Sequence, residues 1–309
     1  QLADKQVHAF TQRQITQNYK EEEFYDVQAL VAALIRNSAF DAATLVKAAM
    51  DLKGAGAALI FLTPQSEHAQ LLQNQLKDGQ LNLAGIGLSE FPASLFSQRG
   101  LRYLMLSRNH LAQLPEKLEA FAALEMLDLA ENQLITLPES IGELKKLTGL
   151  DLSQNRLKHL PETIGNMLQL EALRLDRNPL QSLPASLRGL KNLEMLGLFG
   201  CKFGELPSVV WELSQLRALD LGENNLAALP LEMNGFDQLE SLGLRDNPLQ
   251  DLPAWIGQLP ALRFLDLSYV QARTLPLTMF GHSRLERIYL LREDSMDWEQ
   301  VLPILASMP

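Results

Sequence analysis

Nine of the fifteen prolines in this 309-residue chain recur at every twenty-third position. These prolines are Pro92, Pro115, Pro138, Pro161, Pro184, Pro207, Pro230, Pro253 and Pro276. A fixed period of this length, unbroken by any insertion, is typical of a repeat array in which each unit packs mainly against its neighbours. The part of the chain that carries the period is therefore predicted to consist of stacked copies of one short unit.

Leucine places the start of the array near residue 76, because its frequency doubles there. The stretch 1–75 contains nine leucines, whereas the stretch 76–309 contains 57. The clearest copies, LEMLDLAENQLITLPESIGELKK and LTGLDLSQNRLKHLPETIGNMLQ, begin at Leu124 and Leu147 and share the pattern LxxLxLxxNxLxxLPxxIxxxxx. This pattern resembles the leucine-rich-repeat family, in its short 23-residue class found in bacterial and intracellular plant proteins. The resemblance covers residues 78 to about 292.

Each repeat is predicted to contribute one short strand. Counting the first leucine of each repeat as position 1, apolar positions 4 and 6 alternate with a polar position 5, which indicates a strand with one buried face. One strand cannot bury its apolar face alone, so ten strands are expected to stack in parallel over a continuous leucine core. The position-4 core residues include Leu104, Leu127, Leu150, Leu173, Leu196, Leu219, Leu242 and Leu265.

The predicted fold class is α/β. The resemblance implies a right-handed leucine-rich-repeat solenoid with a curved parallel sheet on its concave face and turns or short 3-10 segments on its convex face. We expect three regions: a helical N-terminal cap or auxiliary domain over 1–77, a solenoid of about nine repeats plus a final strand over 78–292, and a C-terminal cap over 293–309. The cap is expected to be a helix over 295–306 that starts at Ser295 and places Trp298, Val301, Leu302 and Leu305 on one face.

Position 9 is expected to be structural. Six units carry asparagine there, whose amide can bond backbone groups where the strand turns away. These residues are Asn109, Asn132, Asn155, Asn178, Asn224 and Asn247. Cys201 takes the place in one unit and is interpreted as a buried, unreactive thiol. Ile86 and Val270 take it in two units near the ends, and Val270 predicts an altered turn.

Charge and composition argue against several functions. Lysine and arginine number 27 against 37 acidic residues, for a net charge of −10, which disfavours nucleic acid and anionic membrane surfaces as partners. No apolar run is long enough to insert into a membrane. One cysteine and five dispersed histidines, including His110, give no metal-binding or nucleophilic motif. We therefore expect no catalytic residues, no cofactor and no metal.

Positions 3, 5, 7 and 8 are expected to face the concave surface, which suits a protein or an extended peptide. Its candidate partner-binding residues are Tyr103, Met105, Met126, Asp128, Asp151, Arg174, Met195, Phe199, Asp220, Phe264, Asp266, Tyr269, Arg287, Tyr289 and Arg292. Exposed aromatic residues often dominate binding energy, so the late group around Tyr269 and Tyr289 is the leading candidate. Two structural alternatives stay open: the aspartates simply solvate the face, and Phe264 and Tyr289 pack under the C-terminal cap.

The sequence favours a non-enzymatic, monomeric scaffold that binds a protein or peptide partner. One alternative is the substrate-recognition module of a larger bacterial effector or signalling enzyme, such as a ubiquitin ligase, kinase or GTPase, whose catalytic domain lies outside this chain. Another is an exported cell-surface adhesion protein. A single thiol favours a reducing compartment, either the cytoplasm or a host cell that receives an effector, while export stays open because the natural N-terminus is not visible.

Overall fold

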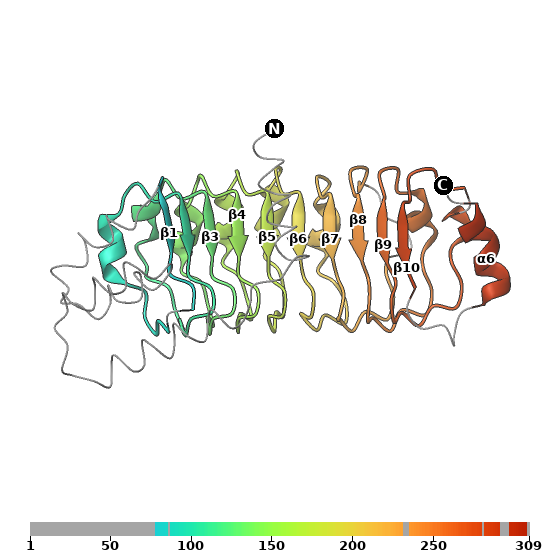
Figure 1. Cartoon of the computed structure of the whole chain (residues 1–309), viewed down its shortest axis with the longest axis horizontal. Coiled ribbons are helices and arrows are strands. Elements are labelled where there is room, and N and C mark those ends of the chain that lie inside the picture. Colours follow the sequence, from blue (N-terminus) through green and yellow to red (C-terminus); the bar gives the residue numbers. More distant parts are fainter. Residues whose placement is uncertain (1–77, 86, 231–234, 280, 291–296, 308–309) are drawn as a thin grey trace, which may run out of the picture.

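The computed structural model describes residues 78–85, 87–230, 235–279, 281–290 and 297–307. Its ten strands form one sheet in chain order, and each strand runs parallel to its neighbours. The strands are β1 Gln80–Asn82, β2 Tyr103–Met105, β3 Met126–Asp128, β4 Gly149–Asp151, β5 Ala172–Arg174, β6 Met195–Gly197, β7 Ala218–Asp220, β8 Ser241–Gly243, β9 Phe264–Asp266 and β10 Arg287–Tyr289. Figure 1 shows them side by side along the molecule in a sheet that does not close, which confirms the predicted solenoid.

The register between strands equals the sequence period. Leu127 pairs with Leu150, and Leu150 pairs with Leu173, so each step along the sheet corresponds to one full repeat of the sequence. Leu150, Leu173 and Leu196 are completely buried, as the alternating pattern predicts. Every repeat therefore adds one rung to a single continuous core.

Short 3-10 helices form the side opposite the sheet, as predicted. They are η1 Ala93–Ser97, η2 Leu118–Phe121, η3 Glu139–Glu143, η4 Glu162–Asn166, η5 Ala185–Gly189, η6 Ser208–Glu212, η7 Ala254–Gln258 and η8 Leu277–Met279. A proline of the periodic series precedes several of them in extended conformation, such as Pro138 at φ −69° and ψ 152° before η3. Proline suits this place because its φ is fixed near this value and the chain needs no amide donor there.

The asparagine ladder is confirmed as structural. In the unit of Asn155, the side-chain Nδ2 donates to the carbonyls of Leu129 and Leu152 at 2.9 and 3.0 Å, while Oδ1 accepts from the backbone N–H of Leu134 at 2.9 Å. The other five asparagines repeat this set. Cys201 replaces the inter-repeat bond with an Sγ contact of 3.3 Å to the Leu175 carbonyl.

The residue before each of these positions has a left-handed backbone, which the sequence analysis did not predict. Positive φ recurs at position 8 in Gly85, Arg108, Glu131, Gln154, Arg177, Gly200, Glu223, Asp246 and Tyr269. At Val270, the turn keeps this conformation, but the backbone N–H of Val270 itself bonds the Leu267 carbonyl at 3.2 Å. The predicted altered turn is thus a change of hydrogen bonding within the same backbone shape.

At the C-terminal end, α6 Trp298–Ala306 is shorter than the helix predicted over 295–306, and Asp297 rather than Ser295 is its N-cap residue. Val301 and Ile304 are the buried residues of this helix, whereas Leu302 is 56% exposed, so its predicted place on the packed face is wrong. The helix turns by about 100° per residue, which puts positions 301 and 304 on one side and 302 on the other. The predictions for 1–77 and for Ile86 lie outside the described residues.

Candidate recognition surface

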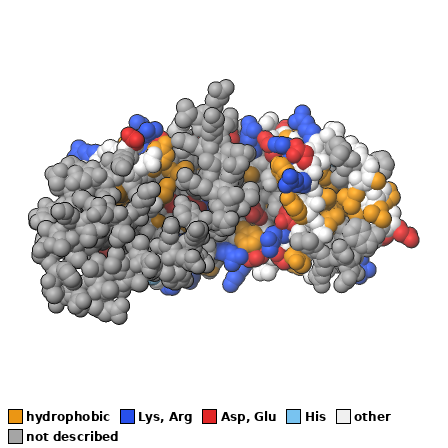
Figure 2. Space-filling model, viewed as in Figure 1, with side chains coloured by type: hydrophobic (Ala, Val, Ile, Leu, Met, Phe, Trp, Pro, Cys, Tyr) orange, Lys and Arg blue, Asp and Glu red, His pale blue; other side chains and the backbone are white. Residues whose placement is uncertain are grey.

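The side chains of positions 3, 5, 7 and 8 lie on the sheet face away from the 3-10 helices. Where described residues are visible on the face drawn in Figure 2, acidic, basic and hydrophobic side chains are interspersed. The candidates nearest the start of the sheet, which we call the early group, are Tyr103, Met105, Met126 and Asp128, and register pairs Tyr103 with Met126 and Met105 with Asp128. All three apolar residues of this group are half-buried, and the Tyr103 hydroxyl donates to Glu125 Oε2 at 3.1 Å. The structure therefore brings the early candidates together but leaves little of them exposed.

The recurring aspartates at position 5 have a structural task. Their Oδ1 atoms accept the backbone N–H two residues later, which is the start of the chain turn after each strand. These bonds run from Ala130 to Asp128 at 3.0 Å, from Ser153 to Asp151 at 2.9 Å, from Gly222 to Asp220 at 3.0 Å and from Ser268 to Asp266 at 2.9 Å. A small residue at position 7 after each aspartate is the sequence signal that could have revealed this motif.

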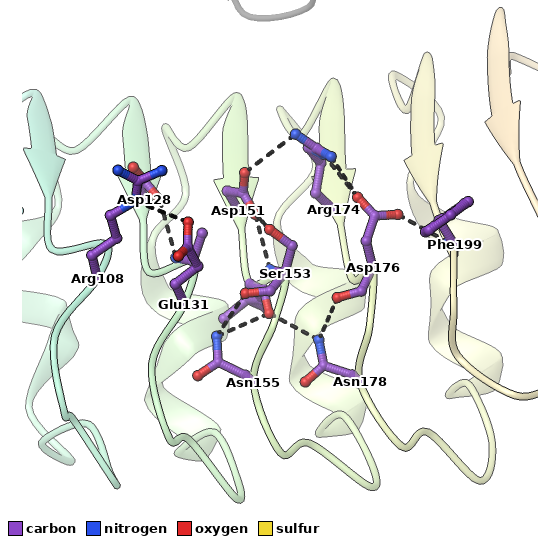
Figure 3. Close-up of polar contacts among 12 residues, drawn as sticks. Arg108, Asp128, Glu131, Asp151, Ser153, Asn155, Arg174, Asp176, Asn178 and Phe199 are labelled. Carbon is purple, nitrogen blue, oxygen red and sulfur yellow. Dashed lines mark hydrogen bonds and ion pairs between the residues drawn. The ribbon is translucent and has the colours of Figure 1, made fainter. Parts of the chain in front are cut away.

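Asp128 and Asp151 lie side by side in register on β3 and β4, as the sequence indicates. Figure 3 shows how the chain itself compensates the second of them: Arg174 reaches Asp151 at 3.7 Å and Asp176 at 2.6 Å. Burial raises the pKa of Asp151, although Arg174 acts in the opposite direction. Asp128 has no such cation among the described residues, and burial together with the Asp151 charge raises its pKa to about 6.

The central candidate Phe199 is packed between two guanidinium groups. Arg177 and Arg245 approach its ring to 5.2 and 5.5 Å from the centroid. Both arginines also pair with Glu223, at 3.1 and 3.9 Å. The nearby candidate Met195 is half-buried. The Phe199 ring therefore packs against other residues of the chain. The sequence analysis missed its arginine partners because they lie one and two repeats away.

Two glycines make this packing possible. A Cβ atom at Gly222 would come within 2.8 Å of both Phe199 and Arg245, and one at Gly197 would come within 2.5 Å of Asp176 Oδ1. That Asp176 oxygen accepts the backbone N–H of Phe199 at 3.0 Å. The two glycines thus leave room for neighbouring side chains on the sheet. As a result, the centre of the face is covered by side chains that contact one another.

The late group differs from the centre. Tyr269 and Tyr289 are 46% and 45% exposed, and Arg287 beside Tyr289 on β10 is exposed as well. Register places Tyr289 opposite Asp266 and Arg287 opposite Phe264, whose ring lies 5.2 Å from the Arg263 guanidinium. We call Phe264, Tyr269, Arg287 and Tyr289 the late patch. With 45% of its surface exposed, Tyr289 is not buried by the C-terminal helix, and Arg292 lies outside the described residues.

A ladder of alternating charges borders the face at position 2, and the sequence analysis missed it. Arg217 bonds Glu194 and Glu240 at 3.6 and 2.9 Å, and Arg263 bonds Glu240 and Glu286 at 3.4 and 2.7 Å. Its signal is visible in the sequence, because the sign of the charge at position 2 alternates from repeat to repeat between Glu194 and Glu286. Each of these exposed ion pairs contributes little to stability. Because the charges are already paired within the chain, they are less available to a partner.

The described residues offer little for catalysis. Burial raises the pKa of the Cys201 thiol to about 12, which disfavours the reactive thiolate. His110 is exposed, while His282 Nε2 contacts the Leu259 carbonyl at 3.0 Å. Among the described residues, no group of histidine, cysteine and acidic side chains has the arrangement of a metal site. The one described α-helix, α6, is too short to cross a bilayer, and none of the described helices qualifies as a membrane span.

Comparison with known proteins agrees with this architecture. A family model described as leucine-rich repeat region matches residues 93–178, and a second, described as leucine rich repeat, matches residues 214–271. No curated protein matches the chain.

Among solved structures, a leucine-rich-repeat protein of Leptospira interrogans is 26% identical, with a TM-score of 0.50 over 72% of this chain and 74% of that one. An internalin of Listeria monocytogenes is 23% identical, with a TM-score of 0.61 over 72% of this chain and 64% of that one.

A plant peptide hormone receptor, solved in complex with the ligand RGF2, is 26% identical, with a TM-score of 0.54 over 69% of this chain and 39% of that one. The fold shared by these proteins is typical of protein-interaction modules, and such modules are typically non-enzymatic. With its 23-residue register, its asparagine ladder and these matches, the chain is a leucine-rich-repeat protein.

Proposed function

We propose that this chain is a non-enzymatic recognition module that binds a protein or peptide through the C-terminal end of its concave face. The observation that carries the proposal is the exposure of Tyr269 and Tyr289, at 46% and 45%, on a face whose central residues are packed against one another. Tyrosine supplies a large contact area at low cost in conformational entropy and is enriched among residues that dominate binding energy. A peptide-bound receptor among the similar structures supports this use of the fold.

The chemistry of the late patch indicates what it can recognise. Two phenol rings and the half-buried ring of Phe264 offer apolar surface, while the exposed Arg287 offers a positive charge at its border. This combination fits the anatomy of an interface, with an apolar centre and a polar rim. The ion-paired position-2 ladder contributes no comparable free charge. We therefore expect contact area rather than net charge to provide most of the affinity.

Site-specific photo-crosslinking can test this proposal and identify the partner at the same time. A benzophenone amino acid is placed at Tyr269 or at Tyr289 in the full chain. A matched control is placed at Leu168, which is 57% exposed in the turn that follows η4. The proposal expects one protein or peptide to be captured at both tyrosine positions and not at Leu168. Equal capture at all three positions would indicate non-specific contact and contradict it.

The captured partner is then purified and titrated against three forms of the chain. The Tyr269→Ala/Tyr289→Ala variant should bind at least about tenfold more weakly than the wild type, because exposed aromatic anchors often account for several kcal/mol. The Leu168→Ala control should bind like the wild type. Unchanged affinity in the double variant, with circular dichroism showing a native fold, would remove the late patch from the site.

A further inference from the structure

One flank of the solenoid is basic although the chain as a whole carries a net charge of −10. The segments that follow β4, β5 and β6, residues 154–160, 177–183 and 200–206, contain four cations, Arg156, Lys158, Arg177 and Lys202, and one acid, Glu205. The equivalent segments after β7 and β8, residues 223–229 and 246–252, contain three acids and no cation. Figure 2 shows lysine and arginine side chains along the lower edge of the molecule near its centre.

Three of the four cations have no ion-pair partner within the described part of the chain. Arg177 is held by Glu223 at 3.1 Å, whereas Arg156, Lys158 and Lys202 form no ion pair with any described residue. All three are exposed. This distinguishes them from the arginines of position 2, each of which lies beside a glutamate of a neighbouring repeat. Their charge is therefore available to an anionic partner.

An exposed apolar side chain lies in the same place. Ile135 is 52% exposed and holds position 12 of its repeat, the position that Lys158 holds in the next one. The backbone N–H of Arg156 donates at 2.9 Å to the carbonyl of Leu134, the residue directly before Ile135. Backbone bonds of this kind run from repeat to repeat along the flank and fix the side chains beside one another. An apolar residue bordered by cations has the layout of a small interface.

We propose that Ile135, Arg156, Lys158 and Lys202, the basic flank, bind an acidic segment of a partner protein that carries an apolar side chain among its carboxylates. Neighbouring repeats stand about 4.8 Å apart, so Arg156 and Lys202, two repeats apart, are separated by roughly 10 Å and match a short extended segment. Single-stranded nucleic acid fits less well, because the only Phe, Tyr or Trp in the three described segments, Phe203, is buried and offers no base a stacking surface.

The probe is the fluorescein-labelled hexapeptide EDLEDE, titrated into the full chain and followed by fluorescence anisotropy. A second peptide, EDSEDE, has the same charge but lacks the apolar side chain. The proposal expects saturable binding that weakens as salt is added and that is stronger for the leucine peptide. Absence of saturable binding, equal affinity for the two peptides, or equally tight binding of a single-stranded RNA would each overturn it.

Two variants of equal charge separate the basic flank from the overall charge of the chain. Arg156→Glu/Lys158→Glu/Lys202→Glu should weaken binding of EDLEDE by about tenfold or more, because three surface charge pairs are lost and reversed. The control Lys117→Glu/Lys146→Glu/Lys191→Glu reverses three exposed lysines elsewhere and should change the affinity by less than about twofold. An equal loss in both variants would contradict a local site.

A third variant tests the apolar contact, and a fourth separates this surface from the late patch. Ile135→Ser should weaken binding of EDLEDE about three- to tenfold and leave EDSEDE unaffected, with no change in melting temperature because the side chain is exposed. Tyr269→Ala/Tyr289→Ala should leave binding of both peptides unchanged, since it lies on different repeats. Loss of peptide binding in that double variant would place the peptide on the late patch instead.

Discussion

The central and late parts of the concave face are built on the same repeat but use their side chains differently. Around β4 to β7, Arg174 and Phe199 are held by neighbouring repeats through ion pairs, ring contacts and backbone bonds. Around β9 and β10, Tyr269 and Tyr289 project with nearly half of their surface exposed. Arg174 and Phe199 depart from the repeat pattern just as the two tyrosines do, so departure from the pattern does not by itself mark a binding surface. The comparison teaches that a side chain on this face stays free where the neighbouring repeats present no partner for it.

The largest expected effect is on stability, and it comes from core substitutions beneath the central and the late part of the concave face. Leu173→Ala on β5 should lower the free energy of unfolding by about 3–5 kcal/mol, because a fully buried side chain leaves a cavity between the repeats on either side. Ile288→Ala on β10 should cost about 1–2 kcal/mol, since that side chain is only half-buried at the end of the sheet. Urea denaturation followed by circular dichroism measures both. Equal losses would mean that the stack is no better packed at its centre.

The second prediction transfers a feature of the late part to the centre. Asn155→Val copies the residue that stands at position 9 beside Tyr269 and removes the bonds to the Leu129 and Leu152 carbonyls and the Leu134 N–H. Buried backbone groups without partners should cost about 2–4 kcal/mol in the free energy of unfolding. The reverse change, Val270→Asn, serves as the control and should not destabilise. A loss below about 0.5 kcal/mol at Asn155 would show that the ladder is dispensable.

A pH-dependent effect is expected at Asp128 on β3, beside the central part, because no cation among the described residues pairs with its carboxylate. The pKa of Asp128 is raised from its ordinary value of 3.8 to about 6 by burial and by Asp151, so folding favours the neutral acid. Its contribution to stability is complete below about pH 4 and is lost as the pH rises through about 6. Asp128→Asn should therefore be more stable than the wild type at pH 7.5, by about 1–3 kcal/mol, with most of the gain absent at pH 4.

Chemical denaturation at the two pH values measures this difference, and comparing the two proteins at each pH cancels the titration of all other groups. Asp151→Asn is the matched comparison, because its carboxylate is paired with Arg174 at 3.7 Å and it should not be stabilised to the same degree. The same wild-type-to-variant difference at both pH values would refute the assignment to Asp128.

The smallest expected effect concerns the backbone of the late patch. Tyr269 has a φ of 59°, a left-handed conformation that glycine adopts without the clash of a Cβ atom. Tyr269→Gly should change the free energy of unfolding by at most about 1 kcal/mol, in the stabilising direction. Tyr289→Gly, in the extended strand β10, should destabilise by about 0.5–1 kcal/mol. Thermal melting of the two variants gives the signs, and destabilisation at Tyr269 would reveal packing that its exposure does not indicate.

Much of the fold could be predicted from the sequence because the repeat is regular. Three kinds of residue recur for a local physical reason: the leucines at position 4, the asparagines at position 9 and the prolines before the 3-10 helices. In the structure, each kind has the role that its recurrence predicts. The site was harder to predict. Asp128, Asp151, Asp220 and Asp266 were candidates for a partner, yet their carboxylates accept backbone N–H groups.

Other parts of the site depended on distances that no pattern within a repeat contains. Arg177 and Arg245 meet around the Phe199 ring, and both pair with Glu223. A Cβ atom at Gly222 would collide with Phe199 and Arg245, so this packing also depends on the glycine. The exposure of Tyr289 was open as well, since the C-terminal helix could have covered it.

The sequence by itself determined the period, the number of stacked strands, their register and the residues of the core, because each repeat must bury the same face against the next. Only the tertiary structure decided which of the outward side chains stay free. That choice is made by contacts between residues one or two repeats apart, such as Arg177 with Glu223, and it depends on the shape and charge of whichever residues the neighbouring repeats present.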